Sequence, residues 1–433
     1  MTTILITNGA ILSAAGWIPC GYLWIEEGRI GALGADDPPR ELLSRADQIL
    51  NAHLCAVLPG FTNAHTHFSQ TFMRGLAGGR PLLEWLKNLI WPLQNALSPE
   101  DMRLATMLGL VENLRSGVTH VVDHHKVAAT PAHTDAVLQS AQQVGLRLTL
   151  ARSWADMGTN AESPASILFD LERLFTTWHT STQDRVQISN GPLVPWRCSE
   201  DTLQKTHTLA QKHSAATHIH VSETEAEVQF TLDATGLRPV AWLDSLGILG
   251  PHSQIVHAVW LDEAELDLLA DRQAPIVHCP LSNAVLGSGI APLRQIHQRQ
   301  IPISLGSDGP ASNDTQDIFE CMKWALGLSR ASSGDPTCLS PGQVLRMATK
   351  GRTLQIGAPA DVILVDLNHT RAMPVHDLDS ALVLCCHSSD VDTVIVGGEL
   401  LMQQKQILNI DEAVLLAECR AAANILRKKA GIL

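Results

Sequence analysis

The stretch Leu58-Pro59-Gly60-Phe61-Thr62-Asn63-Ala64-His65-Thr66-His67 predicts a short apolar strand that ends in two histidines. Side chains alternate along a strand with period two, so His65 and His67 point to the same face. Two imidazole nitrogens on one face supply half of the ligands of a tetrahedral metal site. A histidine pair alone is a weak indication, and the remaining ligands have to come from elsewhere in the chain.

Short apolar runs separated by stretches of helical periodicity organise residues 58–350. Helices are predicted over 99–116 and 200–214, where Ser98 and Ser199 are suitable N-caps. The apolar runs cover residues 58–65, 118–123, 146–152, 186–190, 216–221, 254–259, 275–278 and 302–308. Such a series of strand–helix units matches a (β/α)8 TIM barrel. A doubly wound sheet is the alternative, but it normally has a glycine-rich phosphate turn where this chain has its two histidines.

The two ends of the chain are rich in short strands instead. Strands are predicted at 3–7, 22–26, 29–33, 362–366, 381–384 and 393–396, and a helix at 411–429. We therefore expect an α/β protein with a metal-dependent hydrolase barrel over 58–350. Residues 1–57 and 351–433 are expected to form one composite, β-sandwich-like small domain with a C-terminal helix.

The composition of the chain limits which partners it can bind and which cellular compartment it fits. The net charge of −13 and the pI near 5.8 leave no basic face for a nucleic acid or an anionic membrane. The nine cysteines include no C-x-x-C pair, which excludes a zinc ribbon and fits a reducing compartment. The N-terminus lacks the pattern of a signal peptide, and no stretch is apolar enough to span a bilayer. We expect a cytoplasmic protein that forms a homo-oligomer and binds a small molecule, with neither a nucleic-acid nor a membrane partner.

Titratable side chains gather at the ends of the predicted barrel strands. They are His65 and His67 on the first strand, His220 on the fifth, His257 on the sixth and Asp308 on the eighth, with Glu223 just beyond His220. Each of them alone could be a core or capping residue. Because chemistry in a barrel gathers at the C-terminal ends of the strands, the whole set predicts one functional site.

Roles follow from the chemistry of these groups. Neutral imidazoles and a carboxylate suit Zn²⁺ or Fe²⁺, and a bound metal lowers the pKa of water toward about 7. Glu223 can reach inward to accept and redeliver the proton, and Asp308 can bind the metal and share that proton. His257 can polarise the atom under attack. The fourth strand, at 186–190, has no lysine to carry a bridging carboxylate, so one metal is favoured over two.

Five segments together resemble the amidohydrolase superfamily, and within it the deaminase and chlorohydrolase branch. They are 58–67, 220–224, 257–259, 282–292 and 306–313. This branch includes methylthioadenosine/S-adenosylhomocysteine deaminases, guanine-type deaminases and triazine hydrolases, and the resemblance covers nearly the whole chain. It implies a mononuclear metal held by His65, His67, His220 and Asp308. It also implies that Glu223 and His257 transfer protons and polarise the substrate.

The chain departs from the adenosine-type members at two positions. Where they carry Trp-Pro-x-Glu, whose glutamate binds ribose, this chain has Gln94, which loses the charge-assisted contact. Where they carry Gly-Pro-His-Ser-Pro, this chain has Leu193. Both changes favour a compact free heterocycle over a nucleoside. The connection at 350–361 is also shorter than in family members, which puts the packing of the small domain in question.

Other residues have two interpretations each. Trp85 could stack on a flat ring or pack in the core, and Arg152 could contact substrate or form a structural ion pair. Asp123-His124-His125 could be a substrate-binding or metal-supporting group, but a surface turn is the favoured interpretation. The predicted substrate contacts are Trp85, Gln94, Arg152, Leu193 and Glu223.

The sequence therefore predicts a metal-dependent aminohydrolase for a purine-, pterin- or triazine-like ring. Hydroxide adds to an amidine-like ring carbon, and Glu223 or Asp308 passes a proton to the departing amine. A methylthioadenosine/S-adenosylhomocysteine deaminase is the alternative within the enzymes. A non-catalytic metal-binding barrel that serves as an assembly subunit is the alternative of another class.

Overall fold

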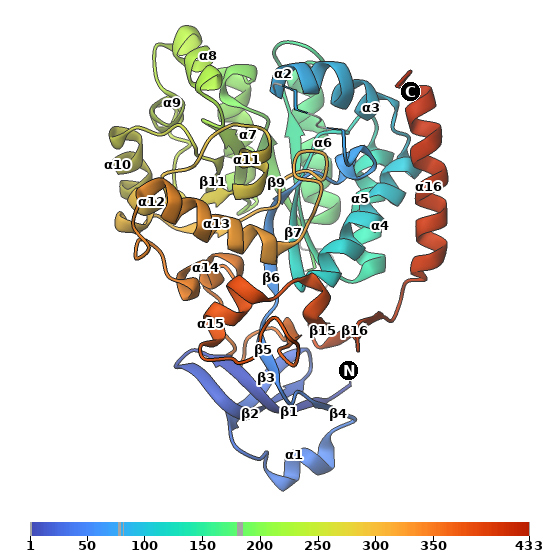
Figure 1. The fold of residues 1–433 in the computed structure, drawn as a ribbon. Helices are drawn as coiled ribbons and strands as arrows, with labels where there is room; N and C mark the ends of the chain where they lie inside the picture. Colours follow the sequence, from blue (N-terminus) through green and yellow to red (C-terminus); the bar gives the residue numbers. More distant parts are fainter. Residues whose placement is uncertain (1, 77–78, 81, 180–184, 433) are drawn as a thin grey trace.

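A parallel barrel forms the centre of the molecule. The computed structural model describes residues 2–76, 79–80, 82–179 and 185–432, and Figure 1 shows its ribbon. The barrel strands are β6 (Phe61–Thr66), β7 (Val118–His125), β8 (Arg147–Trp154), β9 (Val186–Pro192), β10 (Thr217–Val221), β11 (Ser253–His257), β12 (Ile276–His278) and β13 (Ile303–Leu305). They pair in sequence order and in parallel. The backbone N–H of Asp308 donates to the carbonyl of His65 (2.9 Å) and links the last strand to the first. The predicted TIM barrel is confirmed, since a doubly wound sheet would break this order.

Helices cover the outside of the barrel (Figure 1). They are α4 (Pro99–Arg115), α5 (Pro131–Val144), α6 (Pro164–Trp178), α7 (Glu200–Lys212), α8 (Glu225–Thr235), α9 (Pro239–Ser245), α10 (Glu263–Asp271), α11 (Pro280–Val285), α12 (Leu293–Gln298), α13 (Ile318–Ser333) and α14 (Pro341–Ala348). Ser98 caps α4 in a capping box with Asp101, and Ser199 caps α7, as the sequence predicts. None of the described helices is long and apolar enough to cross a membrane.

A second sheet is built from both ends of the chain. Its strands are β1 (Ile4–Ser13), β2 (Gly16–Glu26), β3 (Arg29–Ala35), β4 (Gln48–Asn51), β5 (Cys55–Pro59), β14 (Val362–Asp366), β15 (Val391–Val396), β16 (Glu399–Gln403) and β17 (Gln406–Ile407), and the short helix α1 (Arg40–Arg45) precedes β4. Strand β5 joins the two ends, because it pairs in parallel with β1 and antiparallel with β14. It pairs as far as Pro59, so the predicted domain boundary after residue 57 lies inside this strand.

The small sheet curls over its own core. The turn between β15 and β16 meets the turn between β2 and β3, although three strands separate β15 from β2 in the sheet. At this contact the N–H of Gly398 donates to Ala360 O, and the N–H of Ala360 donates to Gly28 O. A Cβ at Gly398 would lie 2.7 Å from Gly28 Cα, which explains the glycine there. One continuous, folded-over sheet is thus the form that the predicted sandwich-like domain takes.

The small domain is tied to the barrel at the short connection 350–361. The N–H of Leu354 donates to Leu12 O, and the Arg352 guanidinium donates to Gly60 O (2.8 Å) and Thr62 Oγ1 (2.9 Å). The last helix, α16 (Glu412–Lys429), is the predicted 411–429 helix and lies along α4 (Figure 1).

The predicted strand at 381–384 is wrong. The segment continues α15 (Leu378–Ser380) as a single helical turn, Ala381–Cys385. Asp377 caps this helix by accepting a hydrogen bond from the Ser380 N–H (2.8 Å). A short apolar run fits a buried helix as well as a strand, and here the cap precedes it.

Candidate metal centre and active site

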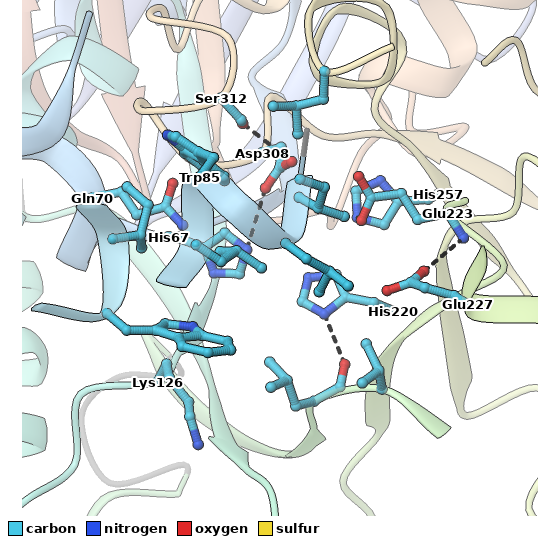
Figure 2. A pocket seen from close by; sticks show the side chains of 18 of the residues that line it. His67, Gln70, Trp85, Lys126, His220, Glu223, Glu227, His257, Asp308 and Ser312 are labelled. Carbon is cyan, nitrogen blue, oxygen red and sulfur yellow. Dashed lines mark hydrogen bonds and ion pairs between the residues drawn. The ribbon is translucent and has the colours of Figure 1, made fainter. Parts of the chain in front are cut away.

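The four predicted metal ligands meet at the C-terminal end of the barrel. The Nε2 atoms of His65 and His67 lie 3.3 and 3.2 Å from Asp308 Oδ1, and His220 Nε2 lies 3.2 Å from His65 Nε2. All four side chains are buried. Figure 2 shows His67, His220 and Asp308 facing one space.

Hydrogen bonds turn the unprotonated nitrogen of each imidazole toward this space. His67 Nδ1–H donates to the carbonyl of His124 (2.8 Å), and His220 Nδ1–H donates to the carbonyl of Leu193 (2.8 Å). The lone pair of His67 Nε2 therefore faces Asp308 Oδ1. Two hydrogen-bond acceptors repel each other at this distance, and a cation between them would stabilise the arrangement. This donor set of imidazole nitrogens and a carboxylate fits a divalent metal ion.

His218 orients the remaining ligand and was missed in the sequence. His65 Nδ1–H donates to His218 Nε2 (2.8 Å), and His218 Nδ1–H in turn donates to Gln254 Oε1 (2.6 Å). Burial lowers the pKa of His218 to about 4, which keeps it neutral and able to accept. The available signal was its position two residues before His220, which puts both on the inner face of β10.

Asp308 is held from several sides. The Gly309 N–H donates to Oδ1 (2.6 Å), and the Ser282 and Ser312 hydroxyls donate to Oδ2 (2.5 and 3.2 Å). Burial opposes ionisation, but the adjacent His65 and His67 rings keep the pKa of Asp308 well below its usual value. Asp308 has a φ of 65°, in the left-handed region that is rare for residues other than glycine. Such strain is concentrated at functional sites.

Glu223 and His257 form a pair beside the predicted ligands. Glu223 Oε2 lies 3.6 Å from His257 Nε2, and Glu223 Oε1 accepts from the Ser288 hydroxyl (3.0 Å). His257 Nδ1–H donates to Asn283 Oδ1 (2.9 Å), so its Nε2 faces the glutamate. Burial, and then the charge of Asp308, raises the pKa of Glu223 to about 8. This carboxyl can therefore hold or release a proton near neutral pH.

Glu227 is a further acidic group of this pocket that sequence reasoning missed. Its Oε2 accepts from the backbone N–H of Glu223 (3.2 Å), and it lies on α8 one helical turn further on. Burial, followed by the charge of Glu223, raises its pKa to about 7. The available signal was that Glu227 lies in the first turn of the helix whose N-cap, Thr224, directly follows Glu223.

The favoured interpretation of Asp123-His124-His125 as a surface turn is wrong. All three side chains are fully buried, because β7 extends two residues beyond its predicted end. His124 Nε2–H donates to Gly191 O (3.1 Å), and its Nδ1 lies 3.4 Å from His220 Nε2. Nitrogens of His65, His124 and His220 all lie within 4.8 Å of one another. His124 thus adjoins the ligand cluster, with a backbone carbonyl that orients His67 and a side chain beside His220.

A pocket opens above these groups, with polar residues at its base and apolar walls. Trp85, Gln94 and Leu193 all line it, and Gln94 Nε2 donates to Ser69 Oγ (3.0 Å). The apolar wall consists of Leu82, Leu83, Trp85, Leu86, Ile90, Trp91, Leu193, Val194, Trp196 and Leu286. The first residues of this wall come from consecutive helical segments, α2 (Leu82–Trp85), Leu86–Ile90 and α3 (Trp91–Ala96), which follow β6. A flat, largely apolar ligand fits such walls.

Arg152 does not line this pocket. It is buried, and it donates to Glu162 Oε2 (2.6 Å) and Asp170 Oδ2 (2.9 Å). The structure thus supports the ion-pair interpretation of this residue and gives no geometric support for a substrate contact.

Gln70 lines the pocket close to Asp308 and was not singled out in the sequence. Its Oε1 is buried and has no hydrogen-bond partner among the described residues. A Cβ at position 309 would lie 2.0 Å from this oxygen, so Gly309 leaves the space that the Gln70 amide occupies. A buried, unsatisfied acceptor in a pocket is a candidate for donors of a ligand.

Comparison with known proteins agrees with this geometry. Residues 56–401 match the model of the amidohydrolase family. The chain is 34% identical over 430 residues to a 5′-deoxyadenosine deaminase of Methanothermobacter thermautotrophicus, covering 97% of this chain and 98% of the relative. It is 36% identical over 376 residues to a 5-methylthioadenosine/S-adenosylhomocysteine deaminase of Pelotomaculum thermopropionicum, covering 84% and 85%.

Solved structures give the same result. An adenosine deaminase from Xanthomonas campestris with bound zinc superposes with a TM-score of 0.91 at 28% identity, over 99% of both chains. An atrazine chlorohydrolase from Arthrobacter aurescens, at 22% identity and a TM-score of 0.90, covers 97% of this chain and 100% of its own, and shows the shared fold. The chain therefore belongs to the amidohydrolase family.

Proposed function

We propose that this chain is a metal-dependent hydrolase that removes an amino group from a nitrogen heterocycle at an amidine-like ring carbon. The observation that carries the proposal is the convergence of His65, His67, His220 and Asp308 beside the Glu223–His257 pair at the base of one pocket. The names of the related deaminases support the same reaction class.

One divalent ion, preferably Zn²⁺, is the proposed cofactor. His65, His67, His220 and Asp308 would hold it, and the Xanthomonas deaminase contains zinc. Such an ion, when bound, lowers the pKa of water and polarises the ring nitrogen or carbon under attack. Fe²⁺ has similar ligand preferences and is the other candidate.

The residues of this chain are proposed to move the proton. Glu223 faces the pocket with a carboxyl whose pKa is raised to about 8, so it can take a proton from the attacking water and return it to the leaving nitrogen. Ser288 fixes one of its oxygens, which leaves the other free for this exchange. His257 presents Nε2 to the same space and can polarise the reacting group.

The proposed substrate is a compact free ring of the purine, pterin or triazine class. Gln94 and Leu193 line the pocket where adenosine-type members have a glutamate and a histidine, which removes two polar contacts to a nucleoside. A second candidate is a 5′-deoxyadenosine or methylthioadenosine substrate, which the names of the relatives favour.

Release of ammonia from a panel of purines, pterins, triazines and nucleosides tests the proposal. In the zinc-loaded protein at least one compound should be turned over. Glu223→Gln should keep the metal yet lose on the order of 100-fold in kcat, as expected for a general acid–base group. Glu225→Gln removes an exposed carboxylate two residues away and serves as the matched control. If no compound releases ammonia while zinc binds normally, the proposed deamination is contradicted and the alternative of a non-catalytic metal-binding subunit is favoured. Normal turnover by Glu223→Gln would move the proton transfer to Asp308 or His257.

A further inference from the structure

Arg197 is a buried cation in the pocket wall that lacks a carboxylate partner. It ends the short helical turn Pro195–Arg197 and is only 4% exposed. Its Nε and Nη2 donate to the Met157 carbonyl (3.2 and 3.1 Å), and Nη2 also donates to the Thr159 carbonyl. Among the described residues, no carboxylate lies within ion-pair distance of its guanidinium, and no hydrogen bond uses Nη1.

Two tryptophan rings flank this guanidinium. Its carbon lies 5.5 Å from the centre of the Trp91 ring and 5.9 Å from that of Trp196. The rings exclude water from the guanidinium, and cation–π attraction offsets part of the desolvation cost. A buried charge without a counter-ion is nevertheless costly, and burial lowers the pKa of Arg197. An anion bound beside the Arg197 guanidinium would therefore be stabilised, and the described residues supply no such anion.

Lys126 adds a second cation to the same wall. Its nearest carboxylate oxygen is Glu162 Oε1, at 3.5 Å, but Arg152 already binds both oxygens of Glu162, at 3.0 and 2.6 Å. Burial lowers the pKa of Lys126; the charge of Glu162 opposes this shift, and the charges of Arg152 and Arg197 add to it. This wall thus carries more positive than negative charge, in a protein whose net charge is −13.

Both cations lie where the active-site pocket opens into a polar side cavity. Trp91, Gln94, Lys126 and Arg197 line both spaces. Figure 2 shows the Lys126 amino group pointing away from His67 and His220, that is, away from the predicted metal centre. Glu162 and Ser163 also line the cavity, and Ser163 is the N-cap of the fifteen-residue helix α6, whose dipole favours negative charge there.

We propose that Arg197 and Lys126 form a subsite for an anionic substituent, a carboxylate or a phosphate, carried by the heterocyclic substrate. The ring would lie over the Glu223–His257 pair, and the substituent would extend past Trp91 to the Arg197 guanidinium. A guanidinium fork binds either oxyanion through paired N–H groups. This inference rests on the proposed function, because it assigns the substrate of that same pocket to a narrower class.

A purely structural role of Arg197 makes a different prediction. Its bonds to the carbonyls of Met157 and Thr159 hold the loop between β8 and α6 in place. Loss of that support alone would weaken the binding of every ligand of the pocket to a similar extent. A subsite for an anion would instead change the ratio of affinities between a charged ligand and its neutral counterpart.

Two matched pairs of compounds measure this ratio: pterin with pterin-6-carboxylate, and adenosine with adenosine 5′-monophosphate. KM is compared for compounds that the zinc-loaded protein turns over, and the calorimetric Kd for those that it does not. In at least one pair the anionic member should bind about ten-fold more tightly or better, a difference of about 1.4 kcal/mol. The pair that shows the preference identifies carboxylate or phosphate as the recognised group.

Arg197→Gln and Lys126→Met should each bring this ratio at least five-fold closer to one. Arg420→Gln, on the exposed face of α16, removes the same charge far from the pocket and should leave the ratio as it is. Equal binding of both members in both pairs, or an unchanged ratio in both pocket variants, would overturn the subsite. Ammonia release with no preference for the anionic ligand would support the proposed function and contradict the subsite. A preference for the anionic ligand with no ammonia release would support the subsite and contradict the proposed function.

Discussion

Replacing Glu223 by glutamine should change how the stability of the metal-free protein depends on pH. Glu223 is 6% exposed, and burial together with the charge of Asp308 raises its pKa from 4.5 to about 8. Between these two values the folded protein holds a proton on Glu223 that the unfolded chain has released. The stability contributed by the wild-type side chain therefore falls as pH rises from about 4.5 to about 8 and is level above that. Glutamine does not ionise, so the Glu223→Gln variant lacks this pH-dependent loss of stability.

The size of the effect follows from the two pKa values. Each pH unit within the window changes the free energy of unfolding by about 1.36 kcal/mol, so the three units from pH 5 to pH 8 give at most about 4 kcal/mol. Urea unfolding of chelator-treated protein at pH 5, 6, 7 and 8 measures it. The difference between the Glu223→Gln variant and the wild type should grow in favour of the variant over this range. Addition of zinc should reduce the slope, because a nearby cation stabilises the ionised carboxylate.

Glu225→Gln is the control, since Glu225 is exposed. Its stability should follow the wild-type pH dependence with a constant offset. If the Glu223→Gln variant shows the same constant offset from pH 5 to pH 8, Glu223 ionises in the folded protein as it does in water. The assignment of this side chain as a proton donor near neutral pH would then fail.

Three further predictions concern the metal, the substrate and the core. The purified protein should hold about one equivalent of Zn²⁺ or Fe²⁺, lost in His65→Ala or Asp308→Asn, and elemental analysis giving two bridged equivalents would contradict the mononuclear site. Gln94→Glu combined with Leu193→His should shift kcat/KM toward nucleosides, whereas a ten-fold preference of the unmodified enzyme for methylthioadenosine, about 1.4 kcal/mol, would refute the free-ring substrate. Arg152→Leu leaves the carboxylates of a buried ion-pair network without their partner and should cost about 3–5 kcal/mol in urea unfolding, and a loss below about 1 kcal/mol would show that the network contributes little.

The barrel and the positions of its polar strand ends could be predicted because both follow from local patterns. The spacing of apolar runs gives the order of strands, and parallel strands bring their C-terminal ends to one rim. His65, His67, His220 and Asp308 therefore meet in the structure although residues 65 and 308 are far apart in sequence. The family resemblance rested on the same segments, and the match over residues 56–401 confirms it.

Contacts that depend on strand length or on packing across the barrel could not be predicted in this way. His124 reaches the ligand cluster only because β7 runs on to His125, whereas the apolar run in the sequence ends at residue 123. The Gln70 amide lies against Gly309, which leaves room for it, and these two residues follow the first and the last strand of the barrel. The run at 381–384 forms a helical turn and not the predicted strand, because four apolar residues carry no period that separates strand from helix.

The composite sheet has a consequence for synthesis of the chain on the ribosome. Strand β5 ends at Pro59, but its antiparallel partner β14 begins only at Val362. About 300 residues must be added in between, which takes roughly 15 to 60 s at 5–20 residues per second. During that time one edge of β5 is paired with β1, and the edge that later pairs with β14 is free. A free strand edge is a template for pairing with a neighbouring nascent chain. Slower initiation, which keeps neighbouring nascent chains further apart, should therefore raise the yield of native protein more than it would for a barrel whose first strand begins the chain.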